Sequence, residues 1–216
     1  MRLFGGHRND VFKTNGFVKV VWRNGFKRRG QIREAVLLEN FVATHTDMKA
    51  RMLVDKSKPV QEEDGKLVTY FHYVDGEIRY PWTLDEIASA ARLLSKLHRI
   101  KHCLHLDYAR GNVLFAPKTH NAIGVIDFET TGVGPVEQEL GRTLSFLLVD
   151  TPTTPGSSSS GFAKRSEAFL TNYGLPYKKN KVLFWAKEYL NLEDYGDLNS
   201  MRDNAIEFLI HSFPAS

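Results

Sequence analysis

The pattern of hydrophobic and polar positions divides the chain into a first part that predicts strands and a second part that predicts helices. Apolar runs on either side of Asn15-Gly16 predict a β-hairpin, because Asn-Gly is a strong signal for a tight hairpin turn. Apolar residues at helical spacings predict a helix over 31–42. A second strand pair is predicted at 59–62 and 67–74, so strands with one helix come first.

The second part opens with a helix signal. Thr83 is followed three residues later by Glu86, which is the spacing of a capping box, and the apolar residues beyond it predict an amphipathic helix ending near His98. Two short apolar stretches then predict a small hairpin, at 113–115 and 123–126. The remaining periodic stretches predict helices at about 137–148, 162–173, 179–190 and 201–211. Between them, the Ser-rich stretch 151–161 is typical of a loop.

These elements predict an α+β protein with a β-rich part at 1–75 and a mainly helical part at 76–216. The chain has 216 residues, 42% of them hydrophobic, which is enough for a sizeable core. No stretch approaches the roughly 18 apolar residues that span a bilayer, and the N-terminus lacks a signal-peptide core. The single cysteine, Cys103, allows no internal disulfide. The simplest interpretation is a cytoplasmic protein without a membrane partner.

Charge is distributed unevenly along the chain. The formal net charge is +4, yet residues 1–58 contain thirteen Lys and Arg against five Asp and Glu, a balance of +8, which leaves −4 for the remainder. A basic part that meets an acidic part fits a cleft for an anionic ligand. The basic run from Arg23 to Arg33 also leaves a nucleic-acid surface open, although such runs are more often solvated faces.

The segments HLDYARGNVLF, residues 105–115, and VIDFE, residues 125–129, carry the candidate chemistry. Asp107 lies five residues before Asn112 on a loop that runs into a predicted strand, and Asp127 ends the next apolar run. Phosphoryl transfer needs charge neutralisation and in-line positioning more than covalent help. Asn112 and Asp127 offer the oxygen ligands that magnesium prefers. Asp107 then remains as the group that takes the proton of an acceptor hydroxyl.

These two segments resemble the aminoglycoside phosphotransferase and choline kinase family, small-molecule kinases distantly similar to protein kinases. That family commonly shows H-G-D-x-x-x-x-N in its catalytic loop and D-[FW]-[ED] in its metal loop, and Asp127-Phe128-Glu129 fits the second pattern. Glu139 stands where the family usually has aspartate, and we expect it to brace the catalytic loop. The resemblance implies a reduced, two-lobed protein-kinase-like fold. It also implies ATP and Mg²⁺ as cofactors, and transfer of the γ-phosphate to a hydroxyl of a small molecule.

The resemblance further implies a nucleotide site in the first part of the chain. Two glycines would let the backbone approach the phosphates, Lys19 would hold the α- and β-phosphates, and Glu34 would pair with Lys19. Glu39 is the less favoured partner, since five residues of helix turn it about 500° from Glu34. Backbone groups near the end of the second strand pair would meet adenine. The residues implied for this site are Gly5, Gly6, Lys19, Glu34, Phe71 and Tyr73.

The sequence departs from the family pattern around the catalytic aspartate. Leu106 replaces the usual glycine, which narrows the conformational freedom of the loop. Ala109 stands where the family often has histidine and protein kinases have lysine, so a group near the transferred phosphoryl is missing. Arg110 is the neighbouring cation that we expect to supply this charge. His105 is expected to brace the loop rather than to act as a base.

Three functions remain open at this point. The leading one is a kinase for a small-molecule hydroxyl, with Asp107 as base. The substitutions at Leu106 and Ala109 also permit a nucleotide-binding pseudokinase that acts as an interaction module. The basic first part permits a kinase of protein or nucleic-acid targets, with Arg23 to Arg33 as the contact surface.

Overall fold

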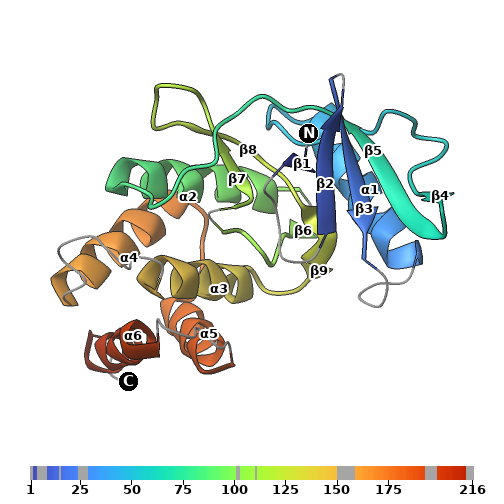
Figure 1. Ribbon diagram of the computed structural model, residues 1–216. Helices are drawn as coiled ribbons and strands as arrows, with labels where there is room; N and C mark the ends of the chain where they lie inside the picture. The colour runs from blue at the N-terminus through green and yellow to red at the C-terminus, as the bar shows by residue number, and fades with distance from the viewer. Residues whose placement is uncertain are drawn as a thin grey trace.

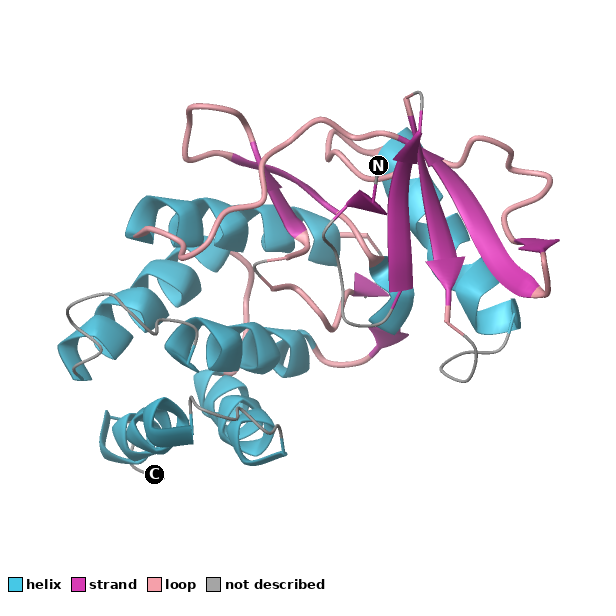
Figure 2. Ribbon diagram, in the orientation of Figure 1, coloured by secondary structure: helices cyan, strands magenta, loops and turns pink. Residues whose placement is uncertain are grey.

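The computed structural model describes residues 2–3, 9–14, 16–23, 29–100, 103–109, 111–149, 159–192 and 199–212. The strands gather near the N-terminus and most helices lie away from them (Figures 1 and 2). A five-stranded antiparallel sheet has the order β1-β2-β3-β5-β4. Its strands are β1 Arg2–Leu3, β2 Asn9–Thr14, β3 Phe17–Trp22, β4 Gln61–Glu63 and β5 Lys66–His72. The α+β class expected from the sequence is confirmed.

The two predicted hairpins of this sheet are both present. In the first, Val11 pairs with Val20, and Gly16 at the turn has a φ of 86°, which glycine adopts without steric cost. In the second, Asp64 and Gly65 have φ values of 50° and 71°, as a two-residue turn between twisted strands requires. Local turn chemistry therefore sets the register of both strand pairs.

The helix α1, Arg29–His45, covers one face of the sheet. Along β3, Val18, Val20 and Trp22 are buried and form a cluster with Ile32 and other residues of α1. Burying each large apolar side chain contributes about 1.5–3 kcal/mol. Because side chains alternate along a strand, the remaining residues of β3 lie on the opposite face.

The second part begins with α2, Leu84–His98, and its capping box is as predicted. The Glu86 backbone N–H donates to Thr83 Oγ1 at 3.3 Å, and the Thr83 N–H donates to the Glu86 carboxylate at 2.8 Å. Two short strand pairs follow: β6 Cys103–Leu104 with β9 Gly132–Val133, and β7 Val113–Phe115 with β8 Ala122–Val125. The second pair is the predicted hairpin. It places Asp107 and Asp127 at the same end of the structure.

Four more helices complete the main core, close to their predicted ranges: α3 Val136–Val149, α4 Ser159–Tyr173, α5 Lys179–Leu192 and α6 Asn199–Ser212. α3 and α5 cross at Gly141, where a side chain would collide with Trp185 and with the α5 backbone. Of residues 151–161, only 159–161 are described, and they begin α4. None of the described helices is both long and apolar enough to cross a bilayer.

Backbone hydrogen bonds also cross between the two parts of the chain. The Lys49 N–H donates to Ile123 O at 2.8 Å, and the Val125 N–H donates to Lys49 O at 2.9 Å. Gly124 lies directly under Lys49, and a side chain there would collide with the Lys49 carbonyl. The segment after α1 is thereby fixed against β8. The division of the chain into 1–75 and 76–216 stays a prediction.

Candidate active site

The loop that carries the predicted catalytic residues, described at 105–109 and 111–112 and called the catalytic loop below, is held from behind by a buried carboxylate on α3. Glu139 Oε2 accepts a hydrogen bond from the His105 backbone N–H, and Oε1 accepts one from the Leu106 N–H, both at 2.7 Å. Glu139 is fully buried. Hydrogen bonds to a buried charge are stronger than those between neutral groups. Glu139 therefore braces the loop as the sequence predicted.

A second connection joins Glu139 to α2 and α4. His98 Nε2 lies 2.9 Å from Glu139 Oε2, and His98 Nδ1 lies 2.6 Å from the Tyr173 hydroxyl. Burial, together with the charge of Glu139, raises the pKa of Tyr173, so its hydroxyl stays protonated. A neutral imidazole satisfies every group, because Tyr173 donates to Nδ1 and Nε2 donates to Glu139. Of this network, only Glu139 was predicted from the sequence.

His105 also acts as a brace, as expected. Its Nε2 donates to Ile126 O at 3.0 Å, and its Nδ1 accepts from the Asp107 N–H at 3.3 Å. The ring packs edge-on against Phe128, with centroids 4.7 Å apart. With both ring nitrogens engaged, His105 has no site left to take a substrate proton in this arrangement.

Leu106 has a φ of 57°, in the left-handed region that glycine adopts freely. A leucine there costs roughly 1–2 kcal/mol. The family's glycine would avoid this cost. The Leu106 side chain lies over Gly132, where an added Cβ atom would come within 3.1 Å of Leu106 Cδ1, and the Leu106 N–H donates to Glu139, so packing and hydrogen bonding hold the strained conformation.

The loop brings together the three residues that the motif predicted. The Asn112 side-chain amide donates to the Asp107 carboxylate at 3.0 Å and to the Asp107 carbonyl at 2.8 Å. The Ile126 N–H donates to the Asn112 carbonyl at 2.9 Å, which sets Asn112 beside Asp127. Both aspartates are partly exposed, at 29% and 30% of their side chains. Asn112 thus orients the Asp107 carboxylate directly.

Arg142 is a cation that the sequence analysis missed. Its Nη2 lies 4.0 Å from Asp107 Oδ1, and it projects from α3 three residues after Glu139. Residues three apart lie on one face of a helix, so the spacing from Glu139 was the signal that pointed to it. Arg110, the residue expected to supply this charge, lies outside the described residues.

A buried ion pair lies on the other side of Asp127. Arg51 Nε and Nη2 donate to the two carboxylate oxygens of Glu39 at 2.6 and 2.8 Å. Arg51 Nη2 also lies 3.8 Å from Asp127 Oδ1, and the Phe128 N–H lies 3.5 Å from Glu39 Oε2. Burial by itself lowers the pKa of Arg51, but Glu39 and Asp127 outweigh it and raise that pKa, so the guanidinium stays charged.

The predicted pairing of Lys19 with Glu34 is wrong. Lys19 Nζ instead binds Glu63 Oε2 at 2.6 Å, and Glu34 is exposed on α1. Lys19 lies on the face of β3 opposite to α1, which strand alternation dictates once Val18 and Val20 face the helix. The helical rotation between Glu34 and Glu39 shows that they face different ways, but it does not show which of them faces the sheet, and Glu34 points to solvent. Glu39 is the buried acid of α1, and its partner is Arg51.

Only some of the other residues predicted for the nucleotide site lie in the described part of the chain. Gly5 and Gly6 lie outside the described residues. Phe71 is fully buried in the sheet, and the Tyr73 N–H donates to Gly16 O at 3.0 Å, so that donor is already used. An adenine contact in this segment stays a prediction. β2 does reach the metal loop, because Asn9 Nδ2 donates to Glu129 Oε2 at 3.0 Å.

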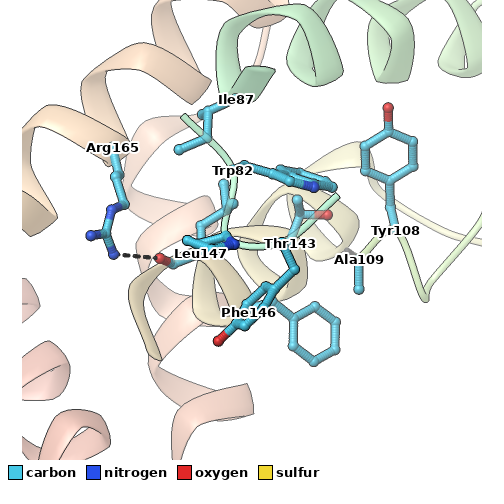
Figure 3. A pocket seen from close by; sticks show the side chains of 10 residues that line it. Trp82, Ile87, Tyr108, Ala109, Thr143, Phe146, Leu147 and Arg165 are labelled. Atoms are coloured by element: carbon cyan, nitrogen blue, oxygen red, sulfur yellow. Dashed lines mark hydrogen bonds between the residues drawn. The ribbon is translucent and has the colours of Figure 1, made fainter. Parts of the chain in front are cut away.

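A pocket opens beside the catalytic loop, between α2, α3 and the segment before α2 (Figure 3). Thr143 and Ala109 face it together with Trp82. Arg165 lies at its edge, where its Nη1 donates to Leu147 O at 3.3 Å. The aromatic residues among its walls are Tyr80, Trp82, Tyr108 and Phe146.

The oxygen atoms that this loop offers can be compared with the ligands that Mg²⁺ needs. Within the described ranges, no cluster of three or more His, Cys, Asp or Glu side chains could hold a metal by itself. Asn112 and Asp127 are a two-ligand set of hard oxygens. Asn112 Oδ1 accepts no hydrogen bond from any described residue, since only its nitrogen is engaged. Such a set fits an ion that shares its coordination with phosphates and water.

Residues 101–161 match the model of the phosphotransferase enzyme family. The match contains Asp107, Asn112, Asp127 and Glu139, the residues that form the centre described above. The expected resemblance to this family is confirmed. The enzyme class predicted from the sequence, a phosphotransferase, is the class that gives the family its name. No curated protein sequence matches the chain significantly.

Solved structures of several kinases and phosphotransferases share the fold along almost the whole chain. A microcompartment-associated aminopropanol kinase matches with a TM-score of 0.62 at 13% identity, over 98% of this chain and 89% of its own. An aminoglycoside phosphotransferase from Alicyclobacillus acidocaldarius gives 0.58 at 12%, over 98% and 92%. The amicoumacin kinase hAmiN, in complex with AMP-PNP, Ca²⁺ and its ligand, gives 0.60 at 11%, over 98% and 88%. The kinase-like fold predicted from the sequence is therefore confirmed.

Proposed function

We propose that the protein is an ATP- and magnesium-dependent phosphotransferase that moves the γ-phosphate of ATP to a hydroxyl of a small molecule. The observation that carries this proposal is the hydrogen bond from Asn112 to the Asp107 carboxylate, in a loop braced by Glu139. A carboxylate that is held through one oxygen and exposed at the other is suited to accept a proton. The family match and the kinase structures support the same assignment.

Asp107 is the group that moves a proton. Asn112 holds Oδ2, while Oδ1 faces Arg142 at 4.0 Å. As the acceptor oxygen bonds to the γ-phosphorus and the bond to the β-phosphate oxygen breaks, the hydroxyl proton passes to Asp107, and ADP leaves. Arg142 is placed to stabilise negative charge on the transferred group, which is the role left open by Ala109.

Asn112 Oδ1 and Asp127 would hold the magnesium ion. When bound, Mg²⁺ neutralises and orients the phosphate oxygens. Arg51 sits on the far side of Asp127, held by Glu39. Its guanidinium takes the role that the sequence analysis gave to Lys19, namely contact with the phosphates. Because Arg51 Nε and Nη2 already donate to Glu39, a phosphate oxygen would be bound by the N–H groups that remain on Nη1 and Nη2.

The decisive test is Asp107→Asn, which keeps size and removes the base. We expect turnover of ATP to fall about 10²- to 10⁴-fold, since general-base catalysis contributes on that order. Nucleotide affinity in the presence of Mg²⁺, measured by isothermal titration calorimetry, should stay within about twofold. Asp85→Asn, in the exposed first turn of α2, is the matched control.

The measurement follows ADP release with a panel of hydroxyl compounds and with water as the acceptor. Equal turnover by wild type and Asp107→Asn would remove Asp107 from the mechanism. Tight nucleotide binding without ADP release from the wild-type protein, even to water, would favour the pseudokinase instead.

A further inference from the structure

Two aromatic rings contact the guanidinium of Arg142, the cation beside Asp107. The Arg142 Cζ atom lies over the Phe146 ring, 5.6 Å from its centroid, and over the Tyr189 ring, 5.3 Å from its centroid. Both distances are within the roughly 6 Å at which a ring face attracts a cation. Phe146 follows Arg142 by four residues on α3, whereas Tyr189 belongs to α5. A second helix therefore contributes to the position of this cation.

Tyr189 is itself held by both α3 and α5. Its hydroxyl accepts a hydrogen bond from Gln138 Nε2 at 3.0 Å, and Gln138 lies four residues before Arg142 on α3. Its ring packs against Trp185, with centroids 6.1 Å apart. Trp185 lies directly over Gly141, where an added Cβ atom would come within 2.5 Å of Trp185 Cβ. The close approach of the two helices and the hydrogen bond at the hydroxyl together fix the Tyr189 ring beside Arg142.

The proposed role of Arg142 requires a positive charge at a fixed place. Its Nη2 lies 4.0 Å from Asp107 Oδ1, which is longer than a hydrogen bond, and its side chain is 19% exposed. An arginine side chain has many rotamers, and restricting it to one of them costs conformational entropy. A ring face that holds the guanidinium before the substrate binds removes this cost from the chemical step. Contact with Tyr189 can therefore raise the rate of transfer.

From these contacts we infer that Tyr189 is a positioning residue for phosphoryl transfer: its ring, on α5, holds the Arg142 guanidinium beside Asp107. This inference rests on the proposed phosphotransferase function, in which Arg142 stabilises negative charge on the transferred group. Because Tyr189 acts through Arg142, its substitution should lower the rate of the chemical step and leave the binding of nucleotide almost unchanged.

The first test is Tyr189→Leu, which removes the ring, with ADP release to water measured at saturating ATP and Mg²⁺. We expect kcat to fall about tenfold, because small misplacements of a catalytic group cost up to about 10²-fold. The KM for ATP should change by less than about twofold. Tyr189→Phe keeps the ring face and should hold kcat within about threefold of the wild type. Phe184→Leu is the matched control, since Phe184 is 56% exposed on the same helix and contacts Trp185 edge-on, and it should leave kcat unchanged.

A double-substitution cycle separates positioning from a general loss of stability. In an Arg142→Met background, Tyr189→Leu should lower kcat by less than about twofold, because the cation that the ring positions is already absent. An equal loss of kcat in both backgrounds would show that Tyr189 only supports the fold, and would overturn the inference while leaving the phosphotransferase proposal intact. Tyr189→Met, which fills more of the space, carries the test if Tyr189→Leu does not fold.

A second measurement needs no turnover. Arg142 Nε is buried, so its N–H signal should be visible in a ¹H–¹⁵N NMR spectrum, where its loss in Arg142→Met assigns it. Because a nearby ring face shifts a proton signal, this signal should move in Tyr189→Leu and stay in place in Tyr189→Phe and Phe184→Leu. An unchanged signal in Tyr189→Leu would overturn the inference. A signal that moves as expected, with no ADP release by the wild type to water or to any hydroxyl compound, would support the placement of Arg142 by Tyr189 and count against the phosphotransferase proposal.

Discussion

Two buried glutamates hold the two sides of the candidate site, and they do so by different means. Glu39 on α1 is neutralised by the Arg51 guanidinium, a side chain that also lies near Asp127. The charge of Glu139 on α3 is instead stabilised by hydrogen bonds, from two backbone N–H groups of the catalytic loop and from the His98 imidazole. Glu39 positions a cation beside Asp127. Glu139 fixes a stretch of backbone.

This difference predicts how substitutions of the two glutamates affect stability. A buried ion pair can be replaced as a unit by apolar residues, often at little cost in stability, whereas removal of one partner leaves an uncompensated charge. A carboxylate that binds backbone N–H groups has no such replacement, because the backbone donors cannot be removed. At the Glu39–Arg51 pair, a double substitution should therefore restore stability without restoring function. At Glu139, stability and function should be lost together.

The largest effect is expected from Glu39→Gln. It leaves Arg51 buried without its counter-ion, so the free energy of unfolding should fall by about 3–5 kcal/mol. The double variant Glu39→Leu/Arg51→Met should recover most of that loss yet bind ATP at least tenfold more weakly. Urea denaturation and calorimetry measure the two properties. Glu34→Gln, exposed on the same helix, is the control, and unchanged ATP affinity in the double variant would exclude Arg51 from the nucleotide site.

A smaller loss is expected from Glu139→Gln. The amide presents a donor to one of the two loop N–H groups, so the free energy of unfolding should fall by about 1.5–3 kcal/mol. Turnover should fall with it, because the backbone that carries Asp107 is no longer fixed, while ATP affinity should hold. Steady-state kinetics and urea denaturation test this. Glu137→Gln on the same helix is the comparison, because the Glu137 carboxylate accepts its hydrogen bond from the exposed Lys178 N–H, at 2.9 Å. Normal turnover in Glu139→Gln would show that the brace is dispensable.

The smallest effect is expected from Lys19→Met. The hydrogen bond with Glu63 raises the pKa of Lys19 and lowers the pKa of Glu63. The contribution of the pair is therefore complete above the unfolded Glu pKa of about 4.3 and below the unfolded Lys pKa of about 10.4. It is lost as the pH falls through the folded pKa of Glu63 or rises through that of Lys19.

Because both side chains of this pair are partly exposed, Lys19→Met should cost only roughly 0.2–1 kcal/mol at pH 7, as measured by urea denaturation. ATP affinity should not change, and Lys66→Met on the exposed face of β5 is the control. A tenfold loss of ATP affinity in Lys19→Met would restore the original assignment of Lys19 and contradict that of Arg51.

Local patterns determined much of the fold from the sequence. The turn at Gly16, the capping box at Thr83 and the helical periodicity of the second part each depend on residues a few positions apart. The motif of Asp107, Asn112 and Asp127 was likewise predictable, because the chemistry of the site and the spacing of a short loop restrict it. Glu139 followed from the resemblance to a known family.

Only the tertiary structure decided which charged groups meet. Glu39 and Arg51 are twelve residues apart, on opposite sides of a helix end, and their pairing depends on how α1 packs against the sheet. That packing also set the face of β3 on which Lys19 lies. Arg142 reaches Asp107 because Glu139 fixes α3 against the loop. The periods of strands and helices predict which residues share a face. Which residues that face contacts depends on packing between segments that are distant in the sequence.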